Sequence, residues 1–462
     1  MNEFSRYLLP LLFLIKLGVG CFFLYVYTYV YGGGLLTHDA GEFLRESKLL
    51  HDVYLQSPKD YFIFLFGLEP DTSFILKYLS KTYHWSAHGK PFFNDSQNVI
   101  RFNSLVYFIS KGWDFTHVLV GSIFSFSALL ITYNWAKLKS SLSKKTILLV
   151  LFTLPSLLFW SSSFLKEPFM ILGIALFCYG IFNEYSSTLK RITYVIGGSV
   201  LALLFKPYVF ILLLIALLFY ALDYLLKQYS ITMKLSLFVI LVSLVFSLPK
   251  VHNSVLNKIT RQQTNFINVG AGGLHIARHD SILFFTTRDV EGLRLENNKA
   301  YIDKDLECFY VTDNIRYTSI PYQAQQSPQP YMILYQSEGS ASHFELTRLN
   351  YSMVRLFKSA PEALLNSFLR PFWSDEGSWL MTLAKLENIF LVILTVFFLY
   401  KGRFKNNTNL PIIITFAIFI FAIMLIIGYT TPVTGAIVRY KIPALLALGI
   451  MIILSFNTKK QT

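Results

Sequence analysis

Residues 410–428 read LPIIITFAIFIFAIMLIIG, and no charged side chain interrupts them. A helix of about 20 apolar residues spans the roughly 30 Å hydrocarbon core of a bilayer, so this stretch predicts a transmembrane helix. Similar runs recur along the chain, which is 54% hydrophobic and only 15% charged. The runs lie near 8–31, 115–136, 146–162, 168–183, 191–205, 208–226, 234–250, 386–400, 410–428 and 441–457. They predict an all-α polytopic membrane protein with about ten transmembrane helices, interfacial helices and a small mixed extramembrane domain.

Lysine and arginine gather in the short loops between these runs. With that number of crossings every such cluster falls on one side of the membrane, which the positive-inside rule makes the cytoplasm. Both termini are then cytoplasmic, and we predict a multi-pass integral protein of the inner (cytoplasmic) membrane. The net charge of +14 is explained by these loops and their attraction to membrane lipids, without a nucleic-acid partner. The clusters are Lys137, Lys139, Lys144 and Lys145; Lys190 and Arg191; Lys227 and Lys234; Lys401, Arg403 and Lys405; and Lys459 and Lys460.

The pattern divides the chain into three segments. An N-terminal transmembrane module covers 1–250 and includes a first outer loop at 32–114. An extracytoplasmic domain follows at 251–385, with short β-rich pieces such as 282–287 and interfacial helices after them. C-terminal transmembrane helices occupy 386–462. The three cysteines predict neither a disulfide framework nor a metal knuckle.

The first candidate site follows the first apolar run, in the segment Thr37-His38-Asp39-Ala40-Gly41-Glu42. If this segment opens a helix, Asp39 and Glu42 lie on one face. Two carboxylates at a membrane surface suit general-base chemistry or the binding of a cation, so a divalent cation stays open as a cofactor. The alternative is a helix cap, with Asp39 at the N-cap and Glu42 in the capping-box position.

Charged residues also lie at the ends of later apolar runs. The pair Lys166-Glu167 precedes Pro168, which is favoured at the start of a helix. Glu167 is a second catalytic candidate and Lys166 a candidate for anion binding; alternatively, the two form a self-paired charge pair at the interface. Lys206 stands between two short apolar runs, where it either snorkels or binds an anion.

Three further basic residues are candidates for binding a phosphate. Arg439 and Lys441 lie just before the last apolar run, and Arg370 lies near the end of the large outer loop. The planar fork of arginine suits a phosphate or carboxylate. No metal site is predicted, because the pairs His84/His88 and His275/His279 have the spacing of metal ligands but no third ligand.

The arrangement of these residues resembles the GT-C superfamily of polytopic glycosyltransferases. In that resemblance Asp39 matches the acid of the first outer loop, with Glu42 beside it, and Glu167 matches the second-loop acid. Lys206 and Arg439 match the basic residues near the carrier phosphate. The segments 154–161, 369–372 and 439–441 are also similar to uncharacterised membrane proteins of Bacteroidetes type.

The resemblance implies transfer of a sugar from a polyprenyl-phosphate-linked donor to a surface glycan, lipid or protein acceptor on the outer face. A polymerase or ligase of surface polysaccharide is the alternative, since it too would combine many spans with a large outer loop. A transporter or flippase is less favoured, because internal repeats are not evident and the charges lie at helix ends.

Overall fold

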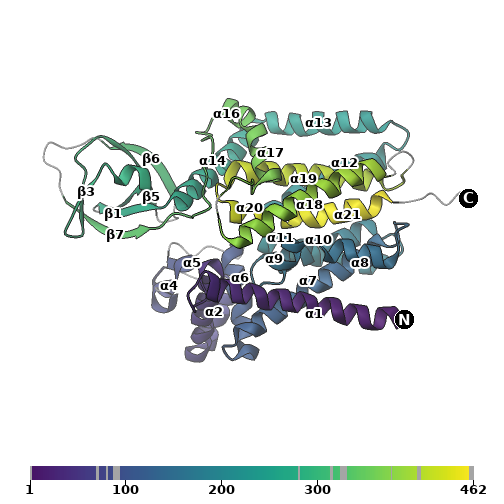
Figure 1. Cartoon of the computed structure of the whole chain (residues 1–462), viewed down its shortest axis with the longest axis horizontal. Helices are drawn as coiled ribbons and strands as arrows, with labels where there is room; N and C mark the ends of the chain where they lie inside the picture. Colours follow the sequence, from purple (N-terminus) through teal and green to yellow (C-terminus); the bar gives the residue numbers. More distant parts are fainter. Residues whose placement is uncertain are drawn as a thin grey trace, which may run out of the picture. The chain divides into compact units, whose positions relative to one another are not determined.

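The computed structural model describes residues 3–68, 72–79, 82–86, 94–278, 281–312, 316–322, 330–375, 377–402 and 407–456 (Figure 1). The chain forms two compact units. The first comprises Met1–Leu235, Phe390–Ile423 and Ile442–Thr462, and the second comprises Ser236–Ile389 and Met424–Lys441. Three helices run from one unit into the other: α13 (Ile231–Ser247), α18 (Trp379–Lys401) and α19 (Leu410–Thr430).

Among the described residues, six helices are long and apolar enough to cross a membrane, and the number rises to nine if each of three bent helix pairs is one span. The chain is therefore a multi-pass integral membrane protein, with six to nine spans in place of about ten. The six are α1 with the π-helical η1 (Tyr7–Val30), α7 (Asp114–Ala136), α11 (Thr188–Phe205), α12 (Pro207–Leu225), α18 and α19.

The difference in span number has a local cause in the bent pairs. The apolar run at 146–162 breaks into α8 (Lys144–Phe152) and α9 (Pro155–Ser161), which meet at 67°, because Pro155 starts a new helix. The other pairs are α13 with α14 (Pro249–Ala271), bent by 85°, and α20 (Thr434–Tyr440) with α21 (Ile442–Ser455), bent by 46°. The apolar α10 (Glu167–Phe182) has only 16 residues.

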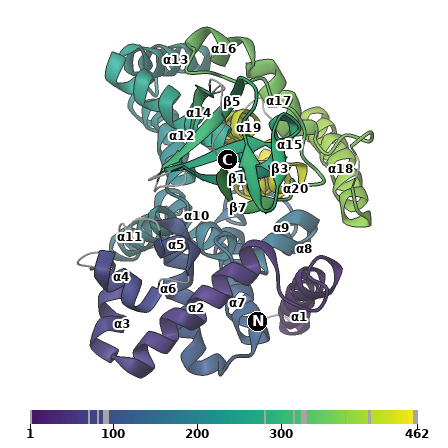
Figure 2. The same ribbon diagram turned by 90° about the vertical axis from the view of Figure 1, so that its left-hand side faces the viewer.

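The segment between α1 and α7, which the sequence predicts to be the first outer loop, is a packed helical layer. It consists of α2 (His38–Gln56), α3 (Pro58–Leu65), α4 (Thr72–Leu79), α5 (Tyr83–Ser86) and α6 (Asp95–Ser110). Figures 1 and 2 show these helices together at the end of α1 (Glu3–Tyr25) away from the N-terminus. The layer shares one apolar core with the ends of α1, α7, α10 and α11, and its Phe43, Leu50 and Trp85 are almost completely buried there. The polar side chains of the layer are therefore held on a rigid support.

Helices α10 and α11 pack backbone against backbone. A Cβ atom added at Gly198 would lie 2.4 Å from the backbone nitrogen of Phe177, so only glycine permits this approach. Small residues at such contacts are typical of membrane helices. Because α11 ends at Phe205 and α10 begins at Glu167, the pair fixes the ends that carry Lys206 and Lys166.

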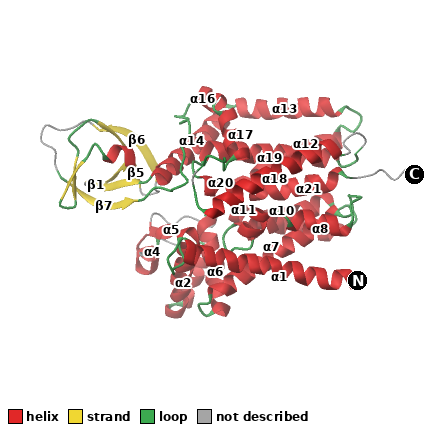
Figure 3. Ribbon diagram, in the orientation of Figure 1, coloured by secondary structure: helices red, strands yellow, loops and turns green. Residues whose placement is uncertain are grey.

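The second unit contains a seven-stranded antiparallel sheet, in the strand order β3-β4-β7-β1-β2-β5-β6 (Figure 3). The strands are β1 (Gly273–Arg278), β2 (Ser281–Thr286), β3 (Arg294–Glu296), β4 (Lys299–Tyr301), β5 (Leu306–Thr312), β6 (Arg316–Tyr322) and β7 (Tyr331–Ser337). In register, Leu274 of β1 faces Phe285 of β2, and both are buried. The sheet confirms the small mixed extramembrane domain expected from the sequence.

Short helices complete the second unit. They are α15 (Thr287–Val290), after β2, and α16 (Met353–Lys358) and α17 (Ala360–Leu369), after β7. Leu349, Leu356 and Ala363 bury an apolar face together with Tyr429 of α19. The Tyr429 hydroxyl donates a hydrogen bond of 2.6 Å to the carbonyl of Leu356, which ties α16 to α19.

Candidate functional site

The N-terminal end of α6 holds one of the predicted lysines. The side chain of Asn94 caps α6 by accepting bonds of 3.1 Å from the backbone nitrogens of Ser96 and Gln97. Asp95 then presents its carboxylate 2.9 Å from the ammonium of Lys166, which also donates a 2.9 Å hydrogen bond to the Ser96 hydroxyl. Lys166 is thus fixed between two residues of the first outer loop.

A second, deeper charge pair lies beside it. Lys206 joins α11 to α12, and its ammonium lies 3.8 Å from the carboxylate of Glu167. The Lys206 and Glu167 side chains are only 7% and 1% exposed. Asn98 of α6 donates a 2.9 Å hydrogen bond to the carbonyl of Leu204, which secures the turn before Lys206. Lys206 therefore does not snorkel towards water.

Lys166 and Glu167 each form an ion pair with a residue of another element, whereas the alternative interpretation paired them with each other. Asp95 of α6 pairs with Lys166, and Lys206, between α11 and α12, pairs with Glu167. Neighbouring residues at a helix start point in different directions, so a self-paired contact is disfavoured. Burial alone would raise the pKa of Asp95, but the ammonium groups of Lys166 and Lys206 hold it below its ordinary value.

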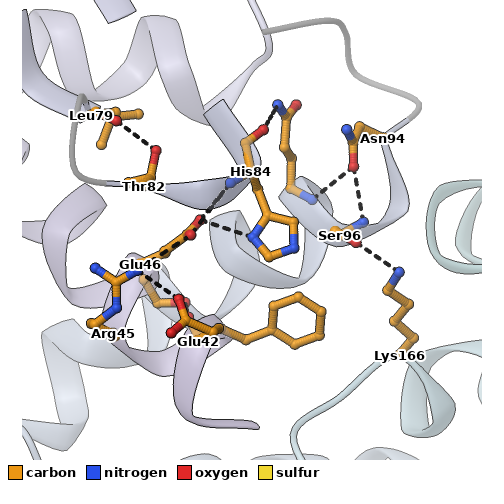
Figure 4. Close-up of polar contacts among 12 residues, drawn as sticks. Glu42, Arg45, Glu46, Leu79, Thr82, His84, Asn94, Ser96 and Lys166 are labelled. Atoms are coloured by element: carbon orange, nitrogen blue, oxygen red, sulfur yellow. Dashed lines mark hydrogen bonds and ion pairs between the residues drawn. The ribbon is translucent and has the colours of Figure 1, made fainter. Parts of the chain in front are cut away.

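A buried carboxylate on α2, absent from the sequence prediction, adds a third charged group. Glu46 is completely buried, and its carboxylate lies 3.0 Å from Nδ1 of His84 in α5 and 3.4 Å from the His84 backbone nitrogen (Figure 4). Arg45 lies 2.6 Å from Glu42 and 3.7 Å from Glu46. The helical spacing of Glu46 with the apolar Phe43 and Leu50 was the signal in the sequence that would have predicted its burial.

Phe43 joins the two groups of charges. Its ring centroid lies 5.3 Å from that of His84 and 5.8 Å from the ammonium of Lys166. Figure 4 shows Glu46 and His84 on one side of this region and Lys166 on the other. We refer to the whole group as the first-loop site, which consists of Glu42, Arg45, Glu46, His84, Asp95, Lys166, Glu167 and Lys206.

Asp39 lies at the start of the helix that carries this site. It is exposed, in the first turn of α2, one turn before Glu42. The N-cap residue of α2 is Thr37, so the interpretation that Asp39 occupies the N-cap is wrong. The ring of His38 lies 5.7 Å from that of Tyr31, which anchors the helix start to the end of η1. Asp39 and Glu42 therefore present acidic groups directly after the first span.

The remaining predicted residues lie in the second unit. The Arg370 guanidinium stacks on Phe344 at 3.7 Å and donates hydrogen bonds to Asp375 (2.5 Å) and Asn366 (3.0 Å). Lys441 is buried and donates a 2.7 Å hydrogen bond to the carbonyl of Arg370. These contacts hold α17, the following turn and the end of α20 together.

Arg439 lies on α20 and is 9% exposed. Arg370, Arg439 and Lys441 belong to the second unit, and Lys166 and Lys206 belong to the first.

The described residues contain no group of three histidine, cysteine, aspartate or glutamate side chains arranged to hold a metal ion. His84 contacts Glu46, and its predicted companion His88 lies outside the described residues. His275 lies in β1, and its companion His279 is likewise outside them. The divalent cation considered from the sequence therefore has no assigned ligands.

The fold and site define a multi-pass helical membrane protein with a cluster of charged side chains where the α2–α6 layer meets the start of α10 and the turn between α11 and α12. No protein family, no curated protein and no solved structure matches this chain.

Proposed function

We propose that this protein transfers a sugar from a polyprenyl-phosphate-linked donor to a glycan, lipid or protein acceptor on the outer face of the membrane. The observation that carries the proposal is the composition of the first-loop site together with Asp39, at the start of the same helix. Exposed acids begin α2 directly after a span, and the ammonium of Lys166 lies beside the same helix, 5.8 Å from Phe43. Transfer from a phosphate needs an acid-base group and cationic stabilisation together.

Asp39 and Glu42 are assigned to the acceptor. A carboxylate takes the proton from the acceptor hydroxyl while the oxygen of that hydroxyl forms a bond to the anomeric carbon of the sugar. The bond between that carbon and the phosphate oxygen breaks, and the electron pair leaves with the polyprenyl phosphate. Asp39 is the preferred base because it is exposed in the first turn of α2, directly after the first span.

Lys166 is assigned to the departing phosphate. The side chain of its partner Asp95 is 33% exposed, so water reaches the edge of this pair. A phosphate arriving there adds negative charge beside an ammonium and is stabilised as the leaving oxygen becomes charged. A donor held in the membrane also suits a site facing the cell exterior, where soluble nucleotide sugars are absent.

Lys206 and Glu167 are assigned a supporting role. Their pair is buried, so Lys206 acts on the phosphate through its field, and Glu167 fixes the position of Lys206. Glu167 is therefore a positioning residue in this proposal rather than the second catalytic acid inferred from the sequence. Arg370, Arg439 and Lys441 remain candidates for carrier-phosphate binding within the second unit.

Lipid analysis of cells lacking the protein tests this function. We expect a polyprenyl monophosphate carrying one sugar to accumulate, and plasmid-borne parent or the Glu184→Gln variant to remove it. Asp39→Asn should fail to remove it. Glu184 is a suitable control because it is an acid of the same unit, 63% exposed and paired with Lys139. Accumulation of a pyrophosphate-linked oligosaccharide repeat would instead identify a polymerase or ligase.

A further inference from the structure

A lysine lies inside the first membrane span. Lys16 is nine residues after Tyr7 and fourteen before Val30, the ends of the span, or about 14 and 21 Å along a helix that rises 1.5 Å per residue. Its side chain is completely buried. Charged groups at this depth are costly and are retained for a specific role.

The partner of Lys16 is the end of a helix. Its ammonium donates a 2.8 Å hydrogen bond to the hydroxyl of Ser161, the last residue of α9. The carbonyl groups at a helix C-terminus carry partial negative charge, so a cation there is favourable. Lys16 therefore connects the middle of α1 to the point where α9 stops.

Three consecutive serines satisfy backbone carbonyl groups at that helix end. The hydroxyls of Ser161, Ser162 and Ser163 donate to the carbonyls of Leu157 (2.5 Å), Leu158 (2.7 Å) and Trp160 (2.7 Å), and all three serines are fully buried. Backbone groups away from water need such internal partners. The segment Ser161-Ser162-Ser163 is thus the buried end of α9.

The turn that follows is held from several sides. Ser122 of α7 donates to the carbonyl of Ser162 at 3.3 Å, and Asn103 of α6 donates to the carbonyl of Phe164 at 3.1 Å. A Cβ atom at Gly121 would lie 2.0 Å from the carbonyl oxygen of Ser163, so α7 touches the turn directly. Two residues after Phe164 the chain reaches Lys166.

We propose that Lys16 is a positioning residue, whose ammonium holds the turn between α9 and α10 and thereby fixes Lys166 and Glu167 in the first-loop site. The link is short: Ser161 is five residues from Lys166, and side chains from α1, α6 and α7 fix the residues between them. Only the catalytic consequence of this inference rests on the proposed function.

The position of the turn is tested by cysteine reactivity. Leu165 is 1% exposed, and Leu165→Cys is placed in a chain whose three native cysteines are alanine. We expect N-ethylmaleimide to label it slowly in the Lys16 parent and roughly tenfold faster or more in Lys16→Met, because opening of the turn exposes the thiol. Lys144→Met, which removes an exposed lysine, should leave the rate unchanged.

Ser161→Ala removes the same hydrogen bond from its other end and should give a similar increase. It also tests the contact if Lys16→Met fails to fold. Elution as a monodisperse peak shows that a variant is folded. The double variant should be labelled at about the rate of either single variant, because both substitutions remove the same contact. Unchanged labelling in both single variants would overturn the inference.

The catalytic arm uses the polyprenyl-phosphate sugar as donor. We expect Lys16→Met to lower kcat by a factor on the order of 10² with a smaller change in KM, as misplacement of catalytic groups does. If the parent shows no transfer, the proposed function fails, and labelling of Leu165→Cys still decides the role of Lys16. A kcat equal to that of the parent, with transfer observed, would contradict the positioning role.

Discussion

The buried pair of Glu167 and Lys206 should contribute strongly to stability. Their charged atoms are 3.8 Å apart, and at an effective dielectric constant of about 20 their attraction is about 4 kcal/mol. Removing one member of such a pair leaves the other charge buried, at a cost of about 3–5 kcal/mol. We therefore expect Glu167→Gln to lower the free energy of unfolding by about 3 kcal/mol.

A double-mutant cycle measures the pair itself. Glu167→Gln, Lys206→Met and their combination are unfolded in detergent micelles by denaturant titration, and the coupling free energy should be about 2–3 kcal/mol. The exposed pair of Lys139 and Glu184 is the matched control. Its atoms are closer, at 3.0 Å, but Glu184 is 63% exposed, so its coupling should stay below about 1 kcal/mol.

The order of the two couplings decides between burial and distance as the controlling factor. A coupling for Glu167 and Lys206 no larger than that of the surface pair would refute the reasoning. It would mean that the deeper pair is screened as effectively as one in water, and that Glu167 does not hold Lys206 in place.

Three further outcomes are expected. Lys166→Ala should lower retention of a polyprenyl phosphate in native mass spectrometry roughly tenfold or more, because a charge-assisted contact is lost; undiminished retention would remove Lys166 from the phosphate site. The difference in the free energy of unfolding between the parent and Asp95→Asn should not change with pH around neutrality. Because the pKa of Asp95 is lowered in the folded state, this difference should disappear only as the pH falls through the folded-state pKa, which lies below the ordinary value of about 3.9. Loss of the difference above pH 5 in denaturant titrations would contradict the prediction. An engineered thiol at Ser141 should resist an impermeant reagent in intact cells, whereas one at the exposed Asn297 in the β3–β4 turn should react; the opposite pattern would reverse the proposed orientation.

The general architecture could be predicted because the thickness of a bilayer sets the length of a membrane-spanning helix, and apolar runs of that length are visible in the sequence. Apolar runs gave the spans, and turn formers with β-rich pieces marked the sheet between β1 and β7. The number of spans was less predictable, because composition does not show that a run such as 146–162 bends at Pro155. Hydropathy shows how many consecutive residues are apolar, but it does not show whether the helix axis bends within them.

The sequence predicted four members of the candidate site, Glu42, Lys166, Glu167 and Lys206, but not its ion pairs with Asp95 and His84. Charged residues at helix ends pointed to Lys166, Glu167 and Lys206, yet which carboxylate meets which lysine depends on how α6, α10 and α11 pack. The contact between Glu46 and His84 was missed for the same reason, since 38 residues separate them. Sequence patterns report local faces, and ion pairs between distant elements follow from tertiary structure.

The most direct test of the proposed function is a single-turnover reaction in nanodiscs with a radiolabelled polyprenyl-phosphate sugar. The parent protein should transfer the label to an acceptor and release polyprenyl phosphate. Asp39→Asn should fold normally and react more slowly by a factor on the order of 10² or more, as loss of a general base does, while Glu184→Gln should react like the parent. Transfer by Asp39→Asn at the parental rate, or no transfer by the parent from any such donor, would contradict the account.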